Sequence, residues 1–181
     1  MRIETDLKLD YSDVLIRPKR STLTSRKEVT LERTYTFRNS QKVYKGIPIM
    51  AANMDGVGTF EMAQANGALG LFTCLVKNYS VQDLITYFNT ENGCRYSTAL
   101  SIGTSDLDLQ KLHEVYFGIS DRTQLKYICV DVANGYTKTF VDTIRKLRET
   151  YPGLTIIAGN VVTADQTQEL ILNGADIVKV G

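Results

Sequence analysis

The sequence predicts an α/β protein whose core is a parallel β-sheet covered by helices. From Ile47 onward, short apolar runs rich in β-branched residues alternate with amphipathic stretches of roughly ten residues. A Ser or Thr that can cap a helix precedes each amphipathic stretch, and turn sequences such as Asn66-Gly67 follow several of them. This alternation is typical of successive strand–helix units, in which each helix packs back onto the sheet.

Six segments are predicted as strands because they are short, apolar and bounded by turn residues. They cover residues 47–52, 69–74, 97–102, 126–132, 154–158 and 176–180. Their starts recur every 22 to 29 residues, close to the roughly 31 residues per unit of an eight-stranded barrel of ~250 residues. This spacing fits a (β/α)₈ TIM barrel with two or more units missing, and it also fits an open, doubly wound sheet.

Five segments between these strands carry apolar residues at helical spacing. They cover residues 59–66, 81–89, 106–117, 137–150 and 163–173. The predicted N-caps are Thr59, Ser80, Ser105, Thr137 and Thr163. Gln166 stands three residues after Thr163, which predicts a capping box there. Asn66-Gly67, Pro152-Gly153 and Asn173-Gly174 predict the turns that end helices.

Residues 1–46 differ in kind from the rest of the chain. They are polar and basic, and the alternation in residues 34–37 predicts a hairpin. We expect this segment to be an extension packed on the barrel, with residues 47–181 forming the six strands and five helices. The basic run between Arg17 and Lys27 fits either a solvated stretch or an arm that captures phosphate.

Composition excludes several classes of protein. Lys and Arg number 21 against 20 Asp and Glu among 181 residues, so no overall field would attract nucleic acid or an anionic membrane. No apolar run approaches the ~20 residues needed to span a bilayer, and the polar start predicts no signal peptide. We therefore expect a cytoplasmic protein with no nucleic-acid or membrane partner.

Polar residues that directly follow strands are the candidates for a binding site, because the carboxyl ends of parallel strands form the binding face. The candidates are Asn53, Met54, Asp55, Lys77, Asp131, Asn134, Gly135, Gly159 and Asn160. Carboxylates, amides and a lysine around one opening suit a ligand with hydroxyls and a phosphate, such as a nucleotide. Asp and Asn also make caps and turns at such positions, so a structural role is the alternative for each.

Other chemistries find little support. His113 is the single histidine and lies in a predicted helix, so we expect no metal site based on histidine and no Ser-His-Asp triad. No Gly-x-Gly-x-x-Gly motif follows a strand. We expect the thiols of Cys74 and Cys129, inside strands, to have raised pKa values, and Cys94 to lie in a turn away from the barrel mouth.

Five segments, in order along the whole chain, resemble one family. They are 9–21 (LDYSDVLIRPKRS), 51–60 (AANMD followed by VGTF), 130–136 (VDVANGY), 158–163 (AGNVVT) and 174–181 (GADIVKVG). Together they resemble the IMP dehydrogenase/GMP reductase family, and residues 53–55 and 134–136 are more similar to its reductase branch. No insertion for a regulatory domain pair appears after the second predicted helix.

The resemblance implies a (β/α)₈ barrel, of which this chain would carry the amino-terminal half. It implies an oxidoreductase of purine salvage that reductively deaminates GMP to IMP and ammonia with NADPH. Similar enzymes are homotetramers and need a monovalent cation, potassium. The family's cation loop and nucleophilic cysteine would follow Gly181, so we expect no catalytic or metal-binding residue within residues 1–181, and no activity from this segment alone.

The resemblance also implies a set of binding residues. The cofactor contacts would be Ser25, Arg26, Lys77, Asp131, Val132 and Ala133, and the purine site would include Asn53 and Met54. Lys77 and Arg26 suit phosphates, whereas the Asp131 carboxylate suits ribose hydroxyls. The loop at residues 76–79 reads Val-Lys-Asn-Tyr, where relatives have His-Lys-His-Tyr, so Asn78 replaces an imidazole. IMP dehydrogenase and a noncatalytic nucleotide-binding half-barrel are the alternatives.

Overall fold

The computed structural model describes residues 3, 5–90 and 93–181, without the side chains of residues 93 and 94. It divides into two compact units, Met1–Thr30 and Leu31–Gly181. The first unit contains two short 3₁₀ helices, Tyr11–Asp13 (η1) and Arg26–Glu28 (η2). All binding-face candidates that follow strands lie in the second unit.

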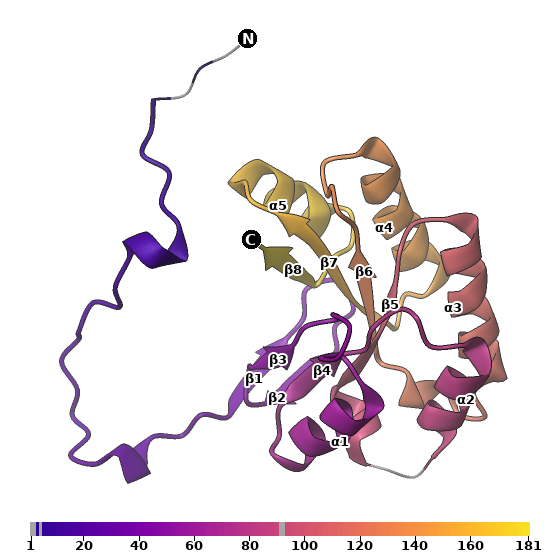
Figure 1. The fold of residues 1–181 in the computed structure, drawn as a ribbon, viewed down its shortest axis with the longest axis horizontal. Coiled ribbons are helices and arrows are strands. Elements are labelled where there is room, and N and C mark those ends of the chain that lie inside the picture. Colours follow the sequence, from indigo (N-terminus) through magenta and orange to yellow (C-terminus); the bar gives the residue numbers. More distant parts are fainter. Residues whose placement is uncertain (1–2, 4, 91–92) are drawn as a thin grey trace. The chain divides into compact units, whose positions relative to one another are not determined.

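A curled parallel sheet forms the centre of the second unit (Figure 1). Within the described residues it has six strands in the order β3-β4-β5-β6-β7-β8, so each strand pairs with its successor along the chain. The strands are β3 (Met50–Ala51), β4 (Phe72–Cys74), β5 (Thr98–Ile102), β6 (Tyr127–Asp131), β7 (Thr155–Val161) and β8 (Ile177–Val180). This order is that of consecutive strands in a (β/α)₈ barrel, and it excludes the doubly wound alternative, in which the order reverses.

Alternating side chains of the strands separate two apolar layers. The concave face of the sheet, which is the barrel interior, carries Phe72, Cys74, Ala99, Tyr127, Cys129 and Ile157. Their strand neighbours Leu100, Ile128, Val130 and Ile156 face the other way and pack in the layer that includes Phe88, Leu112, Phe140 and Leu170 from the helices. Both faces of the four central strands, β4 to β7, are largely buried, which is why these strands are mainly apolar runs, whereas the edge strands β3 and β8 are partly exposed.

In the part of the chain that the structure describes, α-helices cover the outside of the sheet (Figure 1). They are α1 (Phe60–Ala68), α2 (Val81–Asn89), α3 (Asp106–Gly118), α4 (Lys138–Thr150) and α5 (Ala164–Leu172). The five predicted N-caps are confirmed, since each side-chain oxygen accepts the backbone N–H three residues later. Two short 3₁₀ helices, η3 (Gly93–Ser97) and η4 (Arg122–Gln124), precede β5 and β6.

The predicted capping box at Thr163 is wrong. Thr163 does accept the N–H of Gln166, but the Gln166 side chain donates to the carbonyl of Gly135 at 2.7 Å instead of returning to the cap. Reciprocal boxes form instead at the starts of α2 and α3. A tertiary acceptor therefore competes successfully with the local one.

Three predicted boundaries also differ from the structure. The first helix continues through Asn66-Gly67, and the left-handed residue that follows it is Gly70, with φ of +72°. The first strand is shortened to Met50–Ala51 because Pro48 has no N–H to donate to a ladder. Strand β7 runs on to Val161, with a register shift after Gly159.

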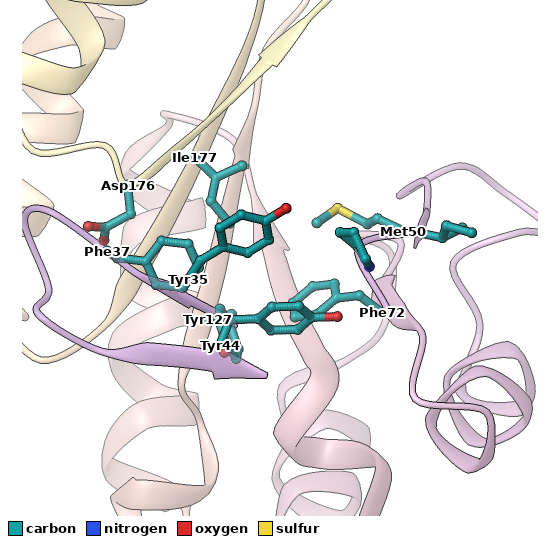
Figure 2. A pocket seen from close by; sticks show the side chains of 10 residues that line it. Tyr35, Phe37, Tyr44, Met50, Phe72, Tyr127, Asp176 and Ile177 are labelled. Carbon is teal, nitrogen blue, oxygen red and sulfur yellow. The ribbon is translucent and has the colours of Figure 1, made fainter. Parts of the chain in front are cut away.

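An antiparallel hairpin of β1 (Arg33–Thr36) and β2 (Val43–Gly46) packs on the amino-terminal end of the barrel interior. The ring of Phe37 meets Tyr127 edge-on at 6.4 Å, and that of Tyr44 meets Phe72 at 6.1 Å. Between hairpin and strands lies an apolar cavity of about 330 Å³ (Figure 2).

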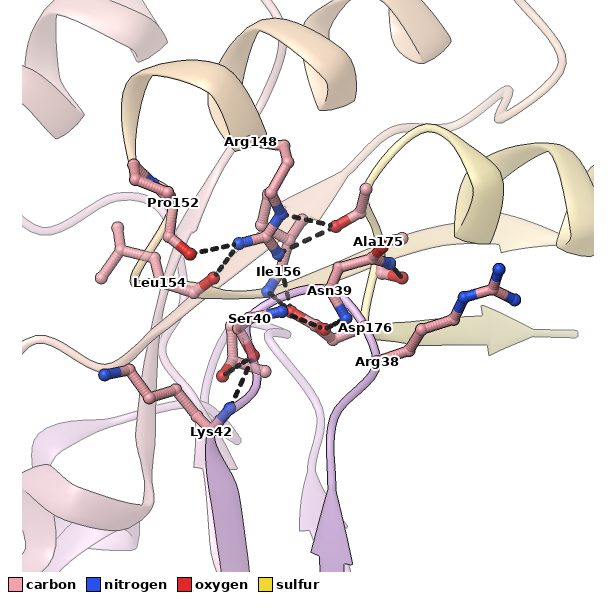
Figure 3. A network of polar contacts seen from close by, with 12 residues as sticks. Arg38, Asn39, Ser40, Lys42, Arg148, Pro152, Leu154, Ile156, Ala175 and Asp176 are labelled. Carbon is pink, nitrogen blue, oxygen red and sulfur yellow. Dashed lines mark hydrogen bonds and ion pairs between the residues drawn. The ribbon is translucent and has the colours of Figure 1, made fainter.

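A buried ion pair fastens the turn of this hairpin to the barrel (Figure 3). Arg148 of α4 contacts the Asp176 carboxylate at 2.7 Å, and the Asp176 side chain is fully buried. The same carboxylate accepts the backbone N–H groups of Asn39 and Ser40, each at 2.9 Å, and that of Ile156 at 3.2 Å. One side chain at the start of β8 thus joins the hairpin, a helix and β7.

Candidate functional site

A polar cavity opens at the carboxyl ends of the strands. Its volume is about 720 Å³, within the range of small-molecule sites. We call it the mouth cavity, and its lining consists of Lys77, Gly103, Thr104, Ser105, Asp108, Asp131, Val132, Ala133, Asn160 and Gly181. These residues follow or end β4, β5, β6, β7 and β8, so the cavity lies at the face where parallel strand–helix folds usually bind ligands.

Lys179 of β8 connects two of the candidates beside this cavity. Its Nζ donates to Asp131 Oδ1 at 2.5 Å and to Asn53 Oδ1 at 2.8 Å. Burial of Lys179 opposes its charge, but the hydrogen bond and charge of Asp131, with smaller contributions from Cys129 and Cys74, outweigh burial and raise its pKa. Lys179 is therefore an ammonium that holds Asn53 and Asp131 in fixed positions.

Gly159 provides the space for Lys179. A Cβ at residue 159 would lie 2.6 Å from the Cβ of Lys179 and 2.6 Å from its carbonyl oxygen. The pairing of β7 and β8 places these two residues opposite each other. Gly159 is thus needed for close approach of the strands.

Two thiols lie in the barrel interior near Lys179. For Cys74 the predicted rise in pKa is confirmed, caused by its hydrogen bond with Cys129 and then by burial. For Cys129 the prediction is wrong, because the hydrogen bond from Cys74, aided by the Lys179 ammonium, outweighs burial and lowers its pKa. Both thiols are buried, and the side chain of Cys94 lies outside the described residues.

One wall of the mouth cavity includes Lys77 and Asp108. Partial burial of Asp108 opposes ionisation, but hydrogen bonds from Ser105 and Gly103, together with the Lys77 ammonium, lower the pKa of Asp108. No hydrogen bond from Lys77 Nζ to another described residue is present, and its side chain is exposed. A cation with free donors is therefore available to an anionic ligand at this wall.

The structure brings several of the predicted site residues together. Lys77 lines the mouth cavity with Asp131, Val132 and Ala133, and Asn53 joins them through its hydrogen bond with Lys179. Asn160 also lines the cavity and donates to the carbonyl of Gly181 at 3.2 Å. The cofactor and substrate roles of these residues stay predictions.

Other predicted residues have different positions. Met54 is 64% exposed and does not line the mouth cavity. The Asn134 carboxamide accepts the N–H of Tyr136, as a turn residue does, and a Cβ on Gly135 would lie 2.5 Å from the carbonyl oxygen of Asn160. Asn134 and Gly135 therefore have structural roles in this loop, and a binding role for either stays a prediction.

Ser25 and Arg26 belong to the first compact unit, Met1–Thr30. There the Ser25 hydroxyl accepts the N–H of Lys27 at 3.2 Å and caps η2, of which Arg26 is the first residue. Within that unit Ser25 has a local structural role, and a cofactor contact by either residue stays a prediction.

Sequence reasoning missed Lys179 and the loop after β5, residues 103–105. A signal for Lys179 was present, because it is the single charged residue within the apolar strand Ile177–Val180. For residues 103–105, the strand-end rule that gave the other candidates also applies. These positions complete the polar lining that the shorter set of candidates left open.

The apolar cavity at the other end of the barrel is a poor site for a polar ligand. Aromatic and aliphatic side chains line it, and Figure 2 shows Tyr35 and Met50 beside the interior rings of Phe72 and Tyr127. Its carboxylate, Asp176, already accepts four hydrogen bonds. Its lining contains no lysine or arginine that could pair with the phosphate of a nucleotide.

His113 lies on α3, exposed, with its ring 4.4 Å from that of Phe117. This position confirms the prediction that His113 lies in a helix. In the part of the chain that the structure describes, the helices are too short or too polar to cross a bilayer.

Comparison with known proteins identifies relatives along the whole chain. The family model described as IMP dehydrogenase / GMP reductase domain matches residues 8–181. GMP reductase 1 of Homo sapiens is 51% identical over 180 residues, and the GMP reductase of Caenorhabditis elegans is 54% identical over 181 residues. Each alignment covers 99% of this chain and 51% or 50% of the relative, so the chain spans about half the length of these proteins.

A solved structure shares the fold. The crystal structure of inosine 5′-monophosphate dehydrogenase from Legionella pneumophila superimposes with a TM-score of 0.76 at 28% sequence identity. The match covers 94% of this chain and 49% of that one. It confirms the prediction that the curled sheet is part of a TIM barrel.

Proposed function

The chain belongs to the IMP dehydrogenase/GMP reductase family, and we propose that the protein containing it is a GMP reductase. Relatives named GMP reductase, at 51% and 54% identity over nearly the whole chain, support the reductase branch. The proposed reaction is the reductive deamination of GMP to IMP and ammonia, with NADPH as the reductant, in purine salvage. NADPH supplies the hydride when bound.

The observation that supports this proposal best is the mouth cavity. It combines the exposed ammonium of Lys77 with the carboxylate of Asp131 and the adjoining backbone of residues 132–133. A cation suits a phosphate and a carboxylate suits ribose hydroxyls, so this donor and acceptor set fits a nicotinamide nucleotide. Asp131 Oδ1 holds Lys179, and among described residues nothing donates to Oδ2, which leaves that oxygen for a ligand hydroxyl.

Lys179 orients both halves of the proposed site. Its ammonium fixes Asp131 on the cofactor side and the carboxamide of Asn53 on the purine side. The Asn53 amide then faces the purine with its oxygen already bonded, so the NH₂ group is the free donor. Met54, which is exposed, would add an apolar contact to the base.

The rest of the proposed machinery lies outside residues 31–181. We propose that Ser25 and Arg26 contact the NADPH of a neighbouring subunit in a homotetramer, and that the enzyme is cytoplasmic. The nucleophilic cysteine and a potassium site are proposed for the residues that follow Gly181. Family resemblance alone supports these assignments.

The test is the full-length protein with purified nucleotides. A GMP reductase oxidises NADPH, followed at 340 nm, only when GMP is present, and IMP and ammonia accumulate in equal amounts. Reduction of NAD with IMP, and no NADPH oxidation with GMP, would identify an IMP dehydrogenase instead. Binding of GMP without turnover in either direction would favour the noncatalytic alternative.

A further inference from the structure

Lys111 makes an unusual contact for a lysine in the middle of a helix. From α3 its Nζ donates to the carbonyl oxygen of Lys77 at 2.6 Å and to that of Tyr79. These acceptors lie 34 and 32 residues earlier in the chain, in the loop after β4. The side chain is half-buried, and burial lowers the pKa of Lys111 while Asp108 opposes that shift. The ammonium has therefore exchanged part of its water for two backbone carbonyls.

The two residues after Lys77 are held as well. Asn78 Nδ2 donates to Asp55 Oδ1 at 3.2 Å. The ring of Tyr79 stacks on Phe60 with centroids 3.8 Å apart, and its hydroxyl accepts the Phe60 N–H at 3.2 Å. Contacts from α3, α1 and the loop after β3 thus restrain residues 77–79, while the Lys77 side chain is exposed at the mouth cavity.

We propose that Lys111 is a positioning residue for Lys77. By holding the carbonyl of Lys77 itself, it fixes the peptide plane next to the Cα of that residue and so the direction in which the Lys77 side chain leaves the backbone. This proposal rests on the proposed function, in which Lys77 contacts a phosphate of NADPH. Under this proposal Lys111, which does not line the mouth cavity, orients the Lys77 ammonium toward it.

A contact that only stabilised α3 would not need this geometry. Ser105 already caps the helix in a reciprocal box with Asp108, and Lys111 lies well inside α3, where a lysine is ordinarily solvated. Charge-assisted hydrogen bonds to carbonyls are stronger than neutral ones, and two of them on one loop restrict its rotation. Loss of the ammonium should therefore affect the loop first and the helix little.

The first measurement needs neither ligand nor activity. Trypsin cleaves after lysine, and Lys111 holds the carbonyl of the Lys77–Asn78 bond, so cleavage there reports release of the loop. In the full-length protein, Lys111→Met should accelerate cleavage after Lys77 about tenfold, equal to ~1.4 kcal/mol of lost protection. Lys111→Arg, which keeps hydrogen-bond donors at this position, should retain most of the protection against cleavage after Lys77. The matched control is Lys146→Met, at an exposed position of α4.

The second measurement tests the action through Lys77. Lys111→Met should raise the KM for NADPH about tenfold and leave the KM for GMP unchanged, and it should add nothing further in a Lys77→Met background. An effect of equal size in both backgrounds would refute the positioning role. So would unchanged NADPH affinity after the loop has become cleavable.

The two measurements separate the two ideas. If the wild-type enzyme binds no NADPH, the proposed function is wrong, and a role of Lys111 in NADPH binding is refuted as well. Cleavage by trypsin would still report whether Lys111 holds the loop. If cleavage after Lys77 is the same in Lys111→Met and Lys146→Met, the role of Lys111 is refuted even in an active reductase.

Discussion

Replacing Asp176 with alanine should lower the free energy of unfolding more than replacing any exposed charged residue of this chain. The carboxylate is fully buried and pairs with Arg148, whose side chain is 16% exposed. Three backbone N–H groups, those of Asn39, Ser40 and Ile156, also donate to it. Asp176→Ala would remove the acceptor for all four donors at once.

The expected loss follows from this geometry. Removing one partner of a buried ion pair costs about 3–5 kcal/mol. Arg148 keeps hydrogen bonds to the carbonyls of Pro152, Leu154 and Gly174, so its charge is not stranded and the lower end applies. We therefore expect a decrease of about 3 kcal/mol in the free energy of unfolding, a large part of the ~5–15 kcal/mol typical of a protein.

The assay is urea denaturation of the full-length protein, followed by circular dichroism, with Asp142→Ala as the control. Asp142 pairs with Arg145 at 3.5 Å, but both side chains are about half exposed, at 48% and 53%. Such a pair should contribute less than ~1 kcal/mol. If Asp176→Ala and Asp142→Ala lose the same small amount of stability, the buried network does not hold the hairpin on the barrel.

The remaining predictions concern the proposed enzyme. In the full-length protein, Asp131→Ala should raise the KM for NADPH and change the KM for GMP little, because a charge-assisted hydrogen bond to the cofactor contributes about 1.5–3 kcal/mol. An unchanged KM for NADPH in steady-state kinetics would show that Asp131 does not bind the cofactor. Serine at Cys74, Cys94 or Cys129 should leave kcat within about tenfold, less than ~1.4 kcal/mol, and a loss of several orders of magnitude for any one would identify it as the nucleophile. A polypeptide of residues 1–181 expressed alone should not oxidise NADPH with GMP and should aggregate, since unpaired edge strands and barrel interior are exposed; turnover by a soluble monomer, detected at 340 nm after size exclusion, would contradict this.

Asn78, at the position where the family resemblance implies an imidazole, has a structural role. The carboxamide donates to Asp55, which follows β3, whereas Asn78 itself follows β4. The contact therefore joins neighbouring loops of the proposed site. From the sequence, Asp55 was a candidate ligand residue; in the structure it supports the loop that carries Lys77.

Local signals in the sequence were sufficient for most of the elements. A helix start depends on a side-chain oxygen and an N–H three residues later, so Thr59, Ser80 and Ser105 could be identified as caps without knowledge of the fold. The predicted capping box at Thr163 was wrong because the Gln166 side chain donates to a carbonyl of another loop. The predicted rise in the pKa of Cys129 was wrong for the same reason, since the residues that lower this pKa, Cys74 and Lys179, come from other strands.

The strand–helix period, the helix caps and, through the motifs, the family can be predicted from the amino-acid sequence alone. Which polar residues act together depends on how the strands are arranged in space. Lys179 and Asn53 are 126 residues apart, yet they meet at 2.8 Å. Asn53 follows β3 and Lys179 lies on β8, the two edge strands of the sheet, which form no ladder with each other. The curl of the sheet brings these edges together, and because curvature arises from the packing of all the strands, no local pattern encodes that contact.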